Sequence, residues 1–198
     1  VILDFYIFSA AKYAIEGNMA DKYQAVFGAI FMPTSVINLV AGFVIRPYIT
    51  KLSDQWERNA LPEFAGTVGR LAAIIAALTA LAVGGAWILG IPVLSMLYPK
   101  IAYMLRECRL ALAFIILGGA FNAYVNLFYY ALIIMQEQKR IFLGYVGVTA
   151  AALLISSPCV RAAGLLGGSL SYLLLMAALT ACFGLTSLVM YRRRVRGI

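Results

Sequence analysis

Five long stretches of the chain contain no Asp, Glu, Lys or Arg, and they limit what the chain can fold into. They are 20 to 30 residues long and cover 23–45, 71–99, 110–136, 141–160 and 162–191. The hydrocarbon core of a bilayer is about 30 Å thick, and a helix that rises about 1.5 Å per residue needs roughly 20 apolar residues to cross it. Each stretch is therefore long enough to span a membrane.

The composition agrees with a membrane protein and excludes an ordinary soluble domain. Hydrophobic residues make up 64% of the 198 residues, and the mean hydropathy is +0.92, well above the values of globular proteins. A shorter apolar stretch, 5–11, lies between Asp4 and Lys12 near a first residue that is not Met. It lacks the basic start and cleavage site of a signal peptide, so we interpret it as a helix cut at its beginning. We expect the chain to be part of a longer protein.

The expected fold class is an all-α integral membrane protein with a bundle of six transmembrane helices. The predicted crossings are 1–16, 23–46, 71–97, 110–135, 141–158 and 164–190. Between the second and third crossings, the segment 51–64 mixes charged residues with Trp56 and Phe64, as expected for an interfacial segment or an ordinary loop. Proline and glycine inside the crossings, such as Pro33 and the pair Gly164 and Gly168, permit bends and close helix approach.

The distribution of basic residues predicts the orientation. The net charge is +8, and the basic residues fall in short breaks between apolar runs. This distribution is better explained by the orientation of a membrane protein than by binding of a nucleic acid. If the basic tail 192–196 is cytoplasmic, ten of the sixteen Lys and Arg residues lie inside, as the positive-inside rule favours. These ten are Arg46, Lys51, Arg58, Arg70, Lys139, Arg140, Arg192, Arg193, Arg194 and Arg196. The six outside are Lys12, Lys22, Lys100, Arg106, Arg109 and Arg161.

The usual signatures of catalysis and of cofactor binding do not occur in the sequence. It has no His, no Walker loop, no G-x-G-x-x-G and no paired metal-ligand spacing, and its three cysteines form no close pair, which argues against a C-x-x-C metal or redox site. We therefore expect no enzymatic activity, no cofactor and no metal site.

Polar residues at helical spacing mark one face of the predicted fourth crossing. Gly118, Asn122, Asn126 and Tyr130 follow each other in steps of four, which places them on one side of a helix. An amide without a partner is costly in the middle of a membrane, so both asparagines should face protein or a water-filled cavity. Hydrogen bonding between helices and lining a substrate path are equally good interpretations.

A second polar stripe runs along the predicted second crossing. Ser35, Asn38, Gly42 and Arg46 are spaced by three and four residues. The Arg46 guanidinium could bind a phosphate, or it could be an anchor at the inner interface. In the first crossing, Lys12 and Glu16 are four residues apart and could form an ion pair, or Lys12 could be a cation of a cavity.

Several of these segments resemble the polysaccharide and lipopolysaccharide biosynthesis membrane proteins known as Wzx-type flippases. The resemblance lies in AKYAIE at 11–16, QAVFGAIFMP at 24–33, VINLVAGF at 36–43 with Arg46 and Pro47 after it, and GIPVLSMLY at 90–98. These proteins belong to the multidrug/oligosaccharidyl-lipid/polysaccharide (MOP) exporter superfamily. The order of six crossings is similar to the C-terminal half of that superfamily, and the resemblance covers essentially the whole chain.

The resemblance implies one half of a MOP-type transporter, whose other bundle would be the missing N-terminal half. Two bundles around a central cavity would move an undecaprenyl-diphosphate-linked oligosaccharide outward across the inner (cytoplasmic) membrane, with the C-terminus in the cytoplasm. The lipid-linked oligosaccharide and the bilayer are the expected partners. The cavity residues expected to bind cargo in this chain are Lys12, Ser35, Asn38, Arg46, Asn122, Asn126 and Tyr130.

Other functions fit parts of the same pattern. A multidrug or metabolite antiporter of the superfamily is expected to use buried carboxylates for ion coupling, and the charge-free runs contain none. A lipid II flippase would differ mainly in its cargo. A membrane-embedded glycan polymerase or ligase would need catalytic residues in its outer breaks, which are short and chemically plain here.

Overall fold

The chain folds into helices along nearly all of its described length. The structure is a computed structural model that describes residues 2–105 and 108–196, and the described residues form no β-strand. Val1 and Arg106, which belong to the predicted first crossing and a predicted outer break, lie outside the described residues. The α-helices are α1 Ile2–Asn18, α2 Asp21–Ile45, α3 Ile49–Glu57, α4 Leu61–Gly85, α5 Ile91–Leu97, α6 Ala102–Leu105, α7 Arg109–Ile134 and α8 Gln138–Arg196. The expected all-α class is confirmed.

Short turns of other helix types join several of these elements. A 3-10 turn, Arg46–Tyr48, connects α2 to α3, and a second, Pro99–Ile101, precedes α6. A π-helical turn, Ala86–Gly90, connects α4 to α5. The segments Lys22–Glu57 and Leu61–Leu97 are therefore almost continuous helical rods.

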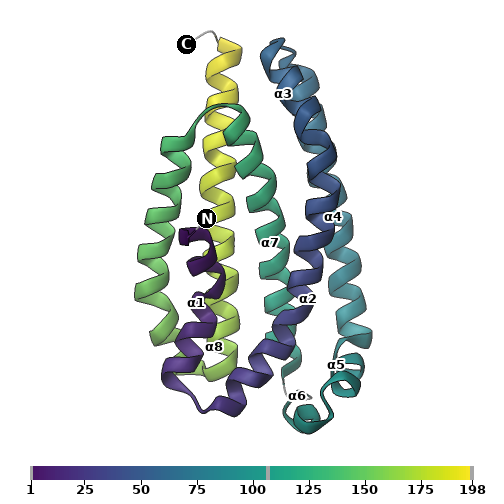
Figure 1. The fold of residues 1–198 in the computed structure, drawn as a ribbon, viewed down its shortest axis with the longest axis vertical. Helices are drawn as coiled ribbons and strands as arrows, with labels where there is room; N and C mark the ends of the chain where they lie inside the picture. Colours follow the sequence, from purple (N-terminus) through teal and green to yellow (C-terminus); the bar gives the residue numbers. More distant parts are fainter. Residues whose placement is uncertain (1, 106–107, 197–198) are drawn as a thin grey trace.

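The long helices lie side by side, and successive ones along the chain alternate in direction, as Figure 1 shows. The tip with α3, the turn from α7 to α8 and the C-terminus are at one end of the bundle, whereas the α1–α2 turn, α5 and α6 are at the other. At this second end α8 reverses direction, because Ala163 (φ −134°) and Gly164 (φ 54°) leave the helical conformation. Glycine adopts a positive φ at no steric cost. The reversal divides α8 into a first arm, 138–162, and a second arm, 165–196.

Among the described residues, four helical stretches are long and apolar enough to cross a membrane, whereas the sequence predicts six crossings. They are Lys22–Glu57, Leu61–Leu97, Arg109–Ile134 and Gln138–Arg196. The difference has two causes. Helix α8 contains both the predicted fifth and sixth crossings, and α1, with 17 residues, is shorter than the roughly 20 that a full crossing needs. The chain is thus an all-helical protein whose long apolar helices suit a multi-pass membrane protein.

The structure corrects the boundary of the predicted third crossing. Helix α4 begins at Leu61, ten residues before the predicted start at 71, with Pro62 in its first turn. Proline is favoured at this position because its missing N–H would have no helical partner there. The predicted loop also contains α3, whose Leu52 and Trp56 are buried. Exposed Glu63 and Arg70 interrupt the apolar run but not the helix, because charged side chains are tolerated on a helix face that reaches the interface.

Two apolar cores share α7. The first joins α1, α2, α7 and α8 around Phe31 and Tyr172, whose ring centroids are 4.9 Å apart. The second joins α2, α3, α4 and α7 around Leu52 and Leu71. A glycine permits the closest approach of α7 to the second arm of α8, since a Cβ on Gly118 would lie 2.6 Å from the Tyr172 ring. Helix α7 is therefore the central helix of the bundle.

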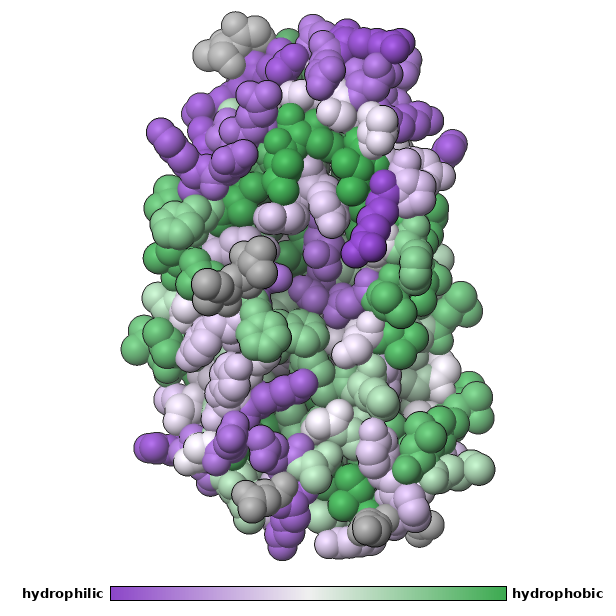
Figure 2. All heavy atoms as spheres, in the orientation of Figure 1, coloured by the Kyte–Doolittle hydropathy of each residue, from purple (hydrophilic) through white to green (hydrophobic). Residues whose placement is uncertain are grey.

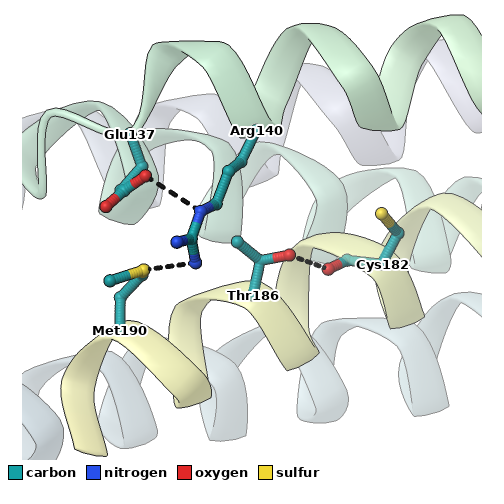
Figure 3. Close-up of polar contacts among 5 residues, drawn as sticks. All are labelled: Glu137, Arg140, Cys182, Thr186 and Met190. Atoms are coloured by element: carbon teal, nitrogen blue, oxygen red, sulfur yellow. Dashed lines mark hydrogen bonds and ion pairs between the residues drawn. The ribbon is translucent and has the colours of Figure 1, made fainter. Parts of the chain in front are cut away.

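Polar contacts join the helices at the end of the bundle that carries the C-terminus. Figure 3 shows Arg140, on the first arm of α8, in an ion pair with Glu137 and donating to the Met190 sulfur on the second arm. Nearby, the Thr186 hydroxyl donates to the Cys182 carbonyl of its own helix, 2.7 Å away. The Arg194 guanidinium lies 4.5 Å from the Trp56 ring centroid and donates to the Trp56 carbonyl. These contacts connect the two arms of α8 with each other and the second arm with α3.

The opposite end has its own contacts. Asn18 accepts a hydrogen bond from Arg161 at 2.7 Å and donates one to Ser157, which joins the end of α1 to the first arm of α8. Arg109, at the start of α7, donates to the Trp87 carbonyl at 2.6 Å. The charge pattern assigns two sets of breaks to opposite membrane faces. In the structure these two sets lie at opposite ends of the bundle (Figure 1).

Candidate functional site

Helices α2 and α7 run in the same direction and meet at a close contact (Figure 1). The Thr34 hydroxyl of α2 donates to the Ile115 carbonyl of α7 at 3.1 Å, and a Cβ on Gly119 would lie 2.8 Å from the Thr34 methyl group. Because the helices are parallel, residues one turn further along each helix reach the same depth. Asn38 and Asn122 are the residues one turn beyond Thr34 and Gly119.

Asn38 carries an amide without a hydrogen-bond partner. Its Nδ2 and Oδ1 atoms are both shielded from solvent, yet neither forms a hydrogen bond with the described residues. An amide removed from water without a compensating hydrogen bond costs about 1 to 3 kcal/mol by the scale of protein mutations. A polar ligand or water that satisfied this amide would recover part of that free energy.

Asn122 and Asn126 are the two amides of the α7 stripe. Asn122 is buried, with 9% of its surface exposed, and Asn126 is half-buried. The Asn126 amide donates to the Asn122 carbonyl of its own helix at 3.1 Å. Among the described residues, neither side chain forms a hydrogen bond with another helix. The sequence allows these two amides to form hydrogen bonds with other helices. Within the described residues they form none.

Tyr130 completes the α7 stripe and packs against aromatic neighbours. Its ring meets the Tyr129 ring edge to face, with centroids 5.6 Å apart. Tyr130 is half-buried and borders the core shared by α2, α3, α4 and α7. The stripe therefore changes from amides to an aromatic ring as α7 approaches the basic end of the bundle.

Lys12 does not pair with Glu16 in the structure. Its ammonium instead lies 4.4 Å from the centroid of the Phe31 ring on α2, a cation–π geometry. The two ion pairs among the described residues join Arg58 to Asp54 and Arg140 to Glu137. Among the described residues, no carboxylate therefore pairs with the Lys12 ammonium next to α2.

Ser35 and Arg46 are the exposed members of the α2 stripe. Neither residue forms a hydrogen bond or an ion pair with the described part of the chain, and Arg46 opens the 3-10 turn after α2. The Arg46 guanidinium is thus available to a ligand at the end of the bundle that carries α3 and the C-terminus.

These residues form a polar track along α2, which we define as Lys12, Ser35, Asn38, Arg46, Asn122, Asn126 and Tyr130. By the rise of an α-helix, Asn38 lies about 10 Å from the level of Phe31 and Lys12, and about 12 Å from Arg46. Amides thus occupy the middle of the track, with one cation toward each end. Figure 2 shows hydrophilic residues gathered in a hollow over α7, between α1 and α2.

A carboxylate inside the bundle was missed by the sequence interpretation. Asp4 is half-buried on α1 and lies near Tyr145 on the first arm of α8. Tyr145 in turn packs against Tyr129 of α7, with ring centroids 6.4 Å apart. The signal is present in the sequence, since Asp4 falls within the predicted crossing 1–16, but Asp4 also flanks the short apolar stretch 5–11 and resembles the charged end of a run.

An apolar groove opens on the other side of α2. It has a volume of about 460 Å³ and lies between α2 and the α4–α5 rod, with Met32, Val36, Leu81 and Leu89 among its lining residues. Hydrocarbon suits this lining, whereas a sugar or a phosphate would lose its hydrogen bonds to water there. The groove is therefore separate from the polar track, although α2 contributes to both.

Comparisons of the chain with protein families, with curated proteins and with solved structures found no match.

Proposed function

We propose that the chain is one six-crossing bundle of a membrane transporter. The count includes α1 and treats the two arms of α8 as separate crossings. The alternating directions of the helices and the reversal at Gly164 support this count. The resemblance of the sequence to MOP exporters implies a second bundle on the other side of the polar track, which would complete a cavity.

The proposed orientation places the basic end, with α3 and the C-terminus, in the cytoplasm. Ten of the sixteen Lys and Arg residues belong to the breaks at this end, and the positive-inside rule favours the cytoplasm for such an end. The proposed location is the inner membrane, where lipid-linked glycans are assembled on the cytoplasmic side in the family that the sequence resembles.

The proposed activity is the transfer of an undecaprenyl-diphosphate-linked oligosaccharide to the outer side of the membrane. One observation supports it above all: among the described residues, the amides of the polar track have no partner on another helix, and Lys12 and Arg46 flank them. Amides exchange hydrogen bonds with sugar hydroxyls, and guanidinium and ammonium groups bind diphosphate oxygens. A glycan and a diphosphate cannot cross about 30 Å of hydrocarbon without such shelter.

Translocation in proteoliposomes tests this activity. The natural protein, reconstituted with a fluorescent undecaprenyl-diphosphate-linked oligosaccharide, should move the lipid between leaflets, as measured by protection from a quencher that cannot cross the membrane. Asn126→Ala should lower the initial rate roughly threefold to tenfold, because a neutral hydrogen bond contributes about 0.5 to 1.5 kcal/mol. Its melting temperature in detergent should remain close to that of the wild type.

Thr79→Ala is the matched control for this experiment. Like Asn126, Thr79 donates a hydrogen bond to a carbonyl one turn earlier in its own helix, but it lies on α4, away from the track. This variant should transport at the wild-type rate. Equal losses of stability and transport in Asn126→Ala would instead show that the residue serves packing, and an unchanged rate would remove Asn126 from the cargo path.

Asp4 supports a second candidate, an ion-coupled antiporter of small molecules. A half-buried carboxylate inside a helical bundle is the kind of group that couples transport to a proton or a cation. Drug efflux that is driven by an ion gradient and lost in Asp4→Asn, without movement of the lipid-linked oligosaccharide, would favour this candidate over the flippase.

A further inference from the structure

The end of α8 presents three arginines on one exposed face. Arg192, Arg193 and Arg196 lie three, four and seven residues after Val189, a spacing that places all four on the same side of a helix. Together they line a depression of about 490 Å³. Arg194 lies outside this group, because its guanidinium is bound to Trp56 and Asn59.

The three guanidinium groups have no protein partner. In the part of the chain that the structure describes, none of them forms a hydrogen bond or an ion pair, and the two acidic residues of this end that form ion pairs do so with other arginines. Glu137 pairs with Arg140, and Asp54 pairs with Arg58. The depression therefore carries three positive charges that no carboxylate of the described residues neutralises.

The same helix face continues into apolar side chains. Leu185 is 64% exposed, and Leu188 and Val189 are each 44% exposed. They precede the arginines by one to three turns, so the face changes from hydrocarbon to guanidinium within about 16 Å. Figure 2 shows the same change at this end of the bundle, where a hydrophilic cap meets apolar surface below it. A molecule that matched the whole face would have an anionic head and an apolar tail.

We propose that this face binds the phosphate of an anionic glycerophospholipid, with its acyl chain along Leu185, Leu188 and Val189. Arginine suits the role because its planar guanidinium binds two phosphate oxygens at once. The convergence of three arginines on one depression distinguishes a site from the diffuse attraction that any basic surface exerts on an anionic leaflet. The site does not depend on what the protein transports.

Binding of fluorescent phosphatidylglycerol to the purified protein in uncharged detergent tests this proposal. The triple variant Arg192→Gln, Arg193→Gln and Arg196→Gln should raise the Kd roughly a hundredfold, since each basic residue near a lipid surface contributes about 1 kcal/mol. Phosphatidylcholine should bind much more weakly than phosphatidylglycerol, because its head group has no net charge.

A charge-matched control separates a site from general attraction. The variant Lys51→Gln, Arg58→Gln and Arg70→Gln also removes three positive charges from exposed residues of the same end, but on α3, α4 and the turn between them. It should change the Kd less than about twofold by the additivity of distant sites. Equal weakening in both triple variants would overturn the proposal, because it would show diffuse attraction.

The source of the phosphate is tested by competition. Inorganic phosphate and glycerol phosphate should displace the fluorescent lipid only at concentrations far above those of unlabelled phosphatidylglycerol, because they lack the acyl chain that contacts the leucines. Displacement by inorganic phosphate at the same concentration as the lipid would identify a site for free phosphate and contradict the assignment to a lipid.

Discussion

Replacing Gly167 with alanine is expected to prevent the chain from folding into a stable bundle. Gly167 lies just after the reversal of α8, and a Cβ at this position would overlap the backbone carbonyl of Cys159 on the first arm. A side chain could rotate away from such a clash, but a backbone carbonyl cannot. Relief would require the two arms of α8 to separate, so we expect a loss of about 3 kcal/mol or more.

The measurement is the yield and melting temperature of monodisperse protein in detergent. Gly147→Ala is the control, because Gly147 belongs to the first arm of the same helix and a Cβ there meets nothing within 4 Å. Alanine is the better helix former by up to about 1 kcal/mol, so this variant should be as stable as the wild type or slightly more so. A Gly167→Ala protein with wild-type stability would contradict the close approach of the two arms.

Replacing Arg46 with alanine is expected to weaken cargo binding by about tenfold to a hundredfold, because a hydrogen bond to a charged group contributes about 1.5 to 3 kcal/mol. Arg46 is exposed and has no partner in the described chain, so the change removes no internal contact. Arg46→Lys should give an intermediate Kd, since lysine keeps the charge but loses the planar fork that fits a diphosphate.

The binding of the fluorescent lipid-linked oligosaccharide to the natural protein measures this effect. Arg70→Ala is the control, since Arg70 is an exposed arginine on α4 outside the polar track, and its Kd should equal that of the wild type. If Arg46 is an interfacial anchor, lysine should replace it fully, because an anchor requires only a long cationic side chain. Wild-type affinity in Arg46→Ala would exclude a role in binding.

Much of the fold could be predicted because a membrane-spanning helix appears in the sequence as an apolar run, and the run ends where the chain passes from hydrocarbon into water. The runs 23–45 and 110–136 correspond closely to α2 and α7. Helix α3 and the first turns of α4 could not be found in this way, since a helix at an interface continues through charged residues such as Glu63 and Arg70. The six predicted crossings correspond to four long apolar helical stretches among the described residues, because two crossings lie on either side of the reversal at Gly164 within α8 and because α1 is short.

The candidate site could be predicted as two stripes, but its contacts could not. Steps of three and four residues placed Asn38 on a face of α2, and Asn122 and Asn126 on one face of α7. The spacing of residues does not determine which acceptor an amide binds, and the Asn126 amide donates to the Asn122 carbonyl of its own helix. Spacing also allowed an ion pair between Lys12 and Glu16, whereas the Lys12 ammonium lies over the Phe31 ring. Such choices depend on neighbours that are remote in sequence.

The accessibility of the polar track to water tests its proposed role in transport most directly. In a protein whose native cysteines are replaced with serine, Ser35→Cys and Val36→Cys place thiols at the same depth on different sides of α2. Both positions are exposed, but Ser35 belongs to the track, whereas Val36 lines the apolar groove. A hydrophilic thiol reagent requires water and an ionised thiol. We expect Ser35→Cys to react rapidly in native membranes, with protection by the lipid-linked oligosaccharide, and Val36→Cys to remain unmodified. Equal reactivity of the two thiols, or no reaction at Ser35→Cys, would contradict a water-filled cargo path along α2.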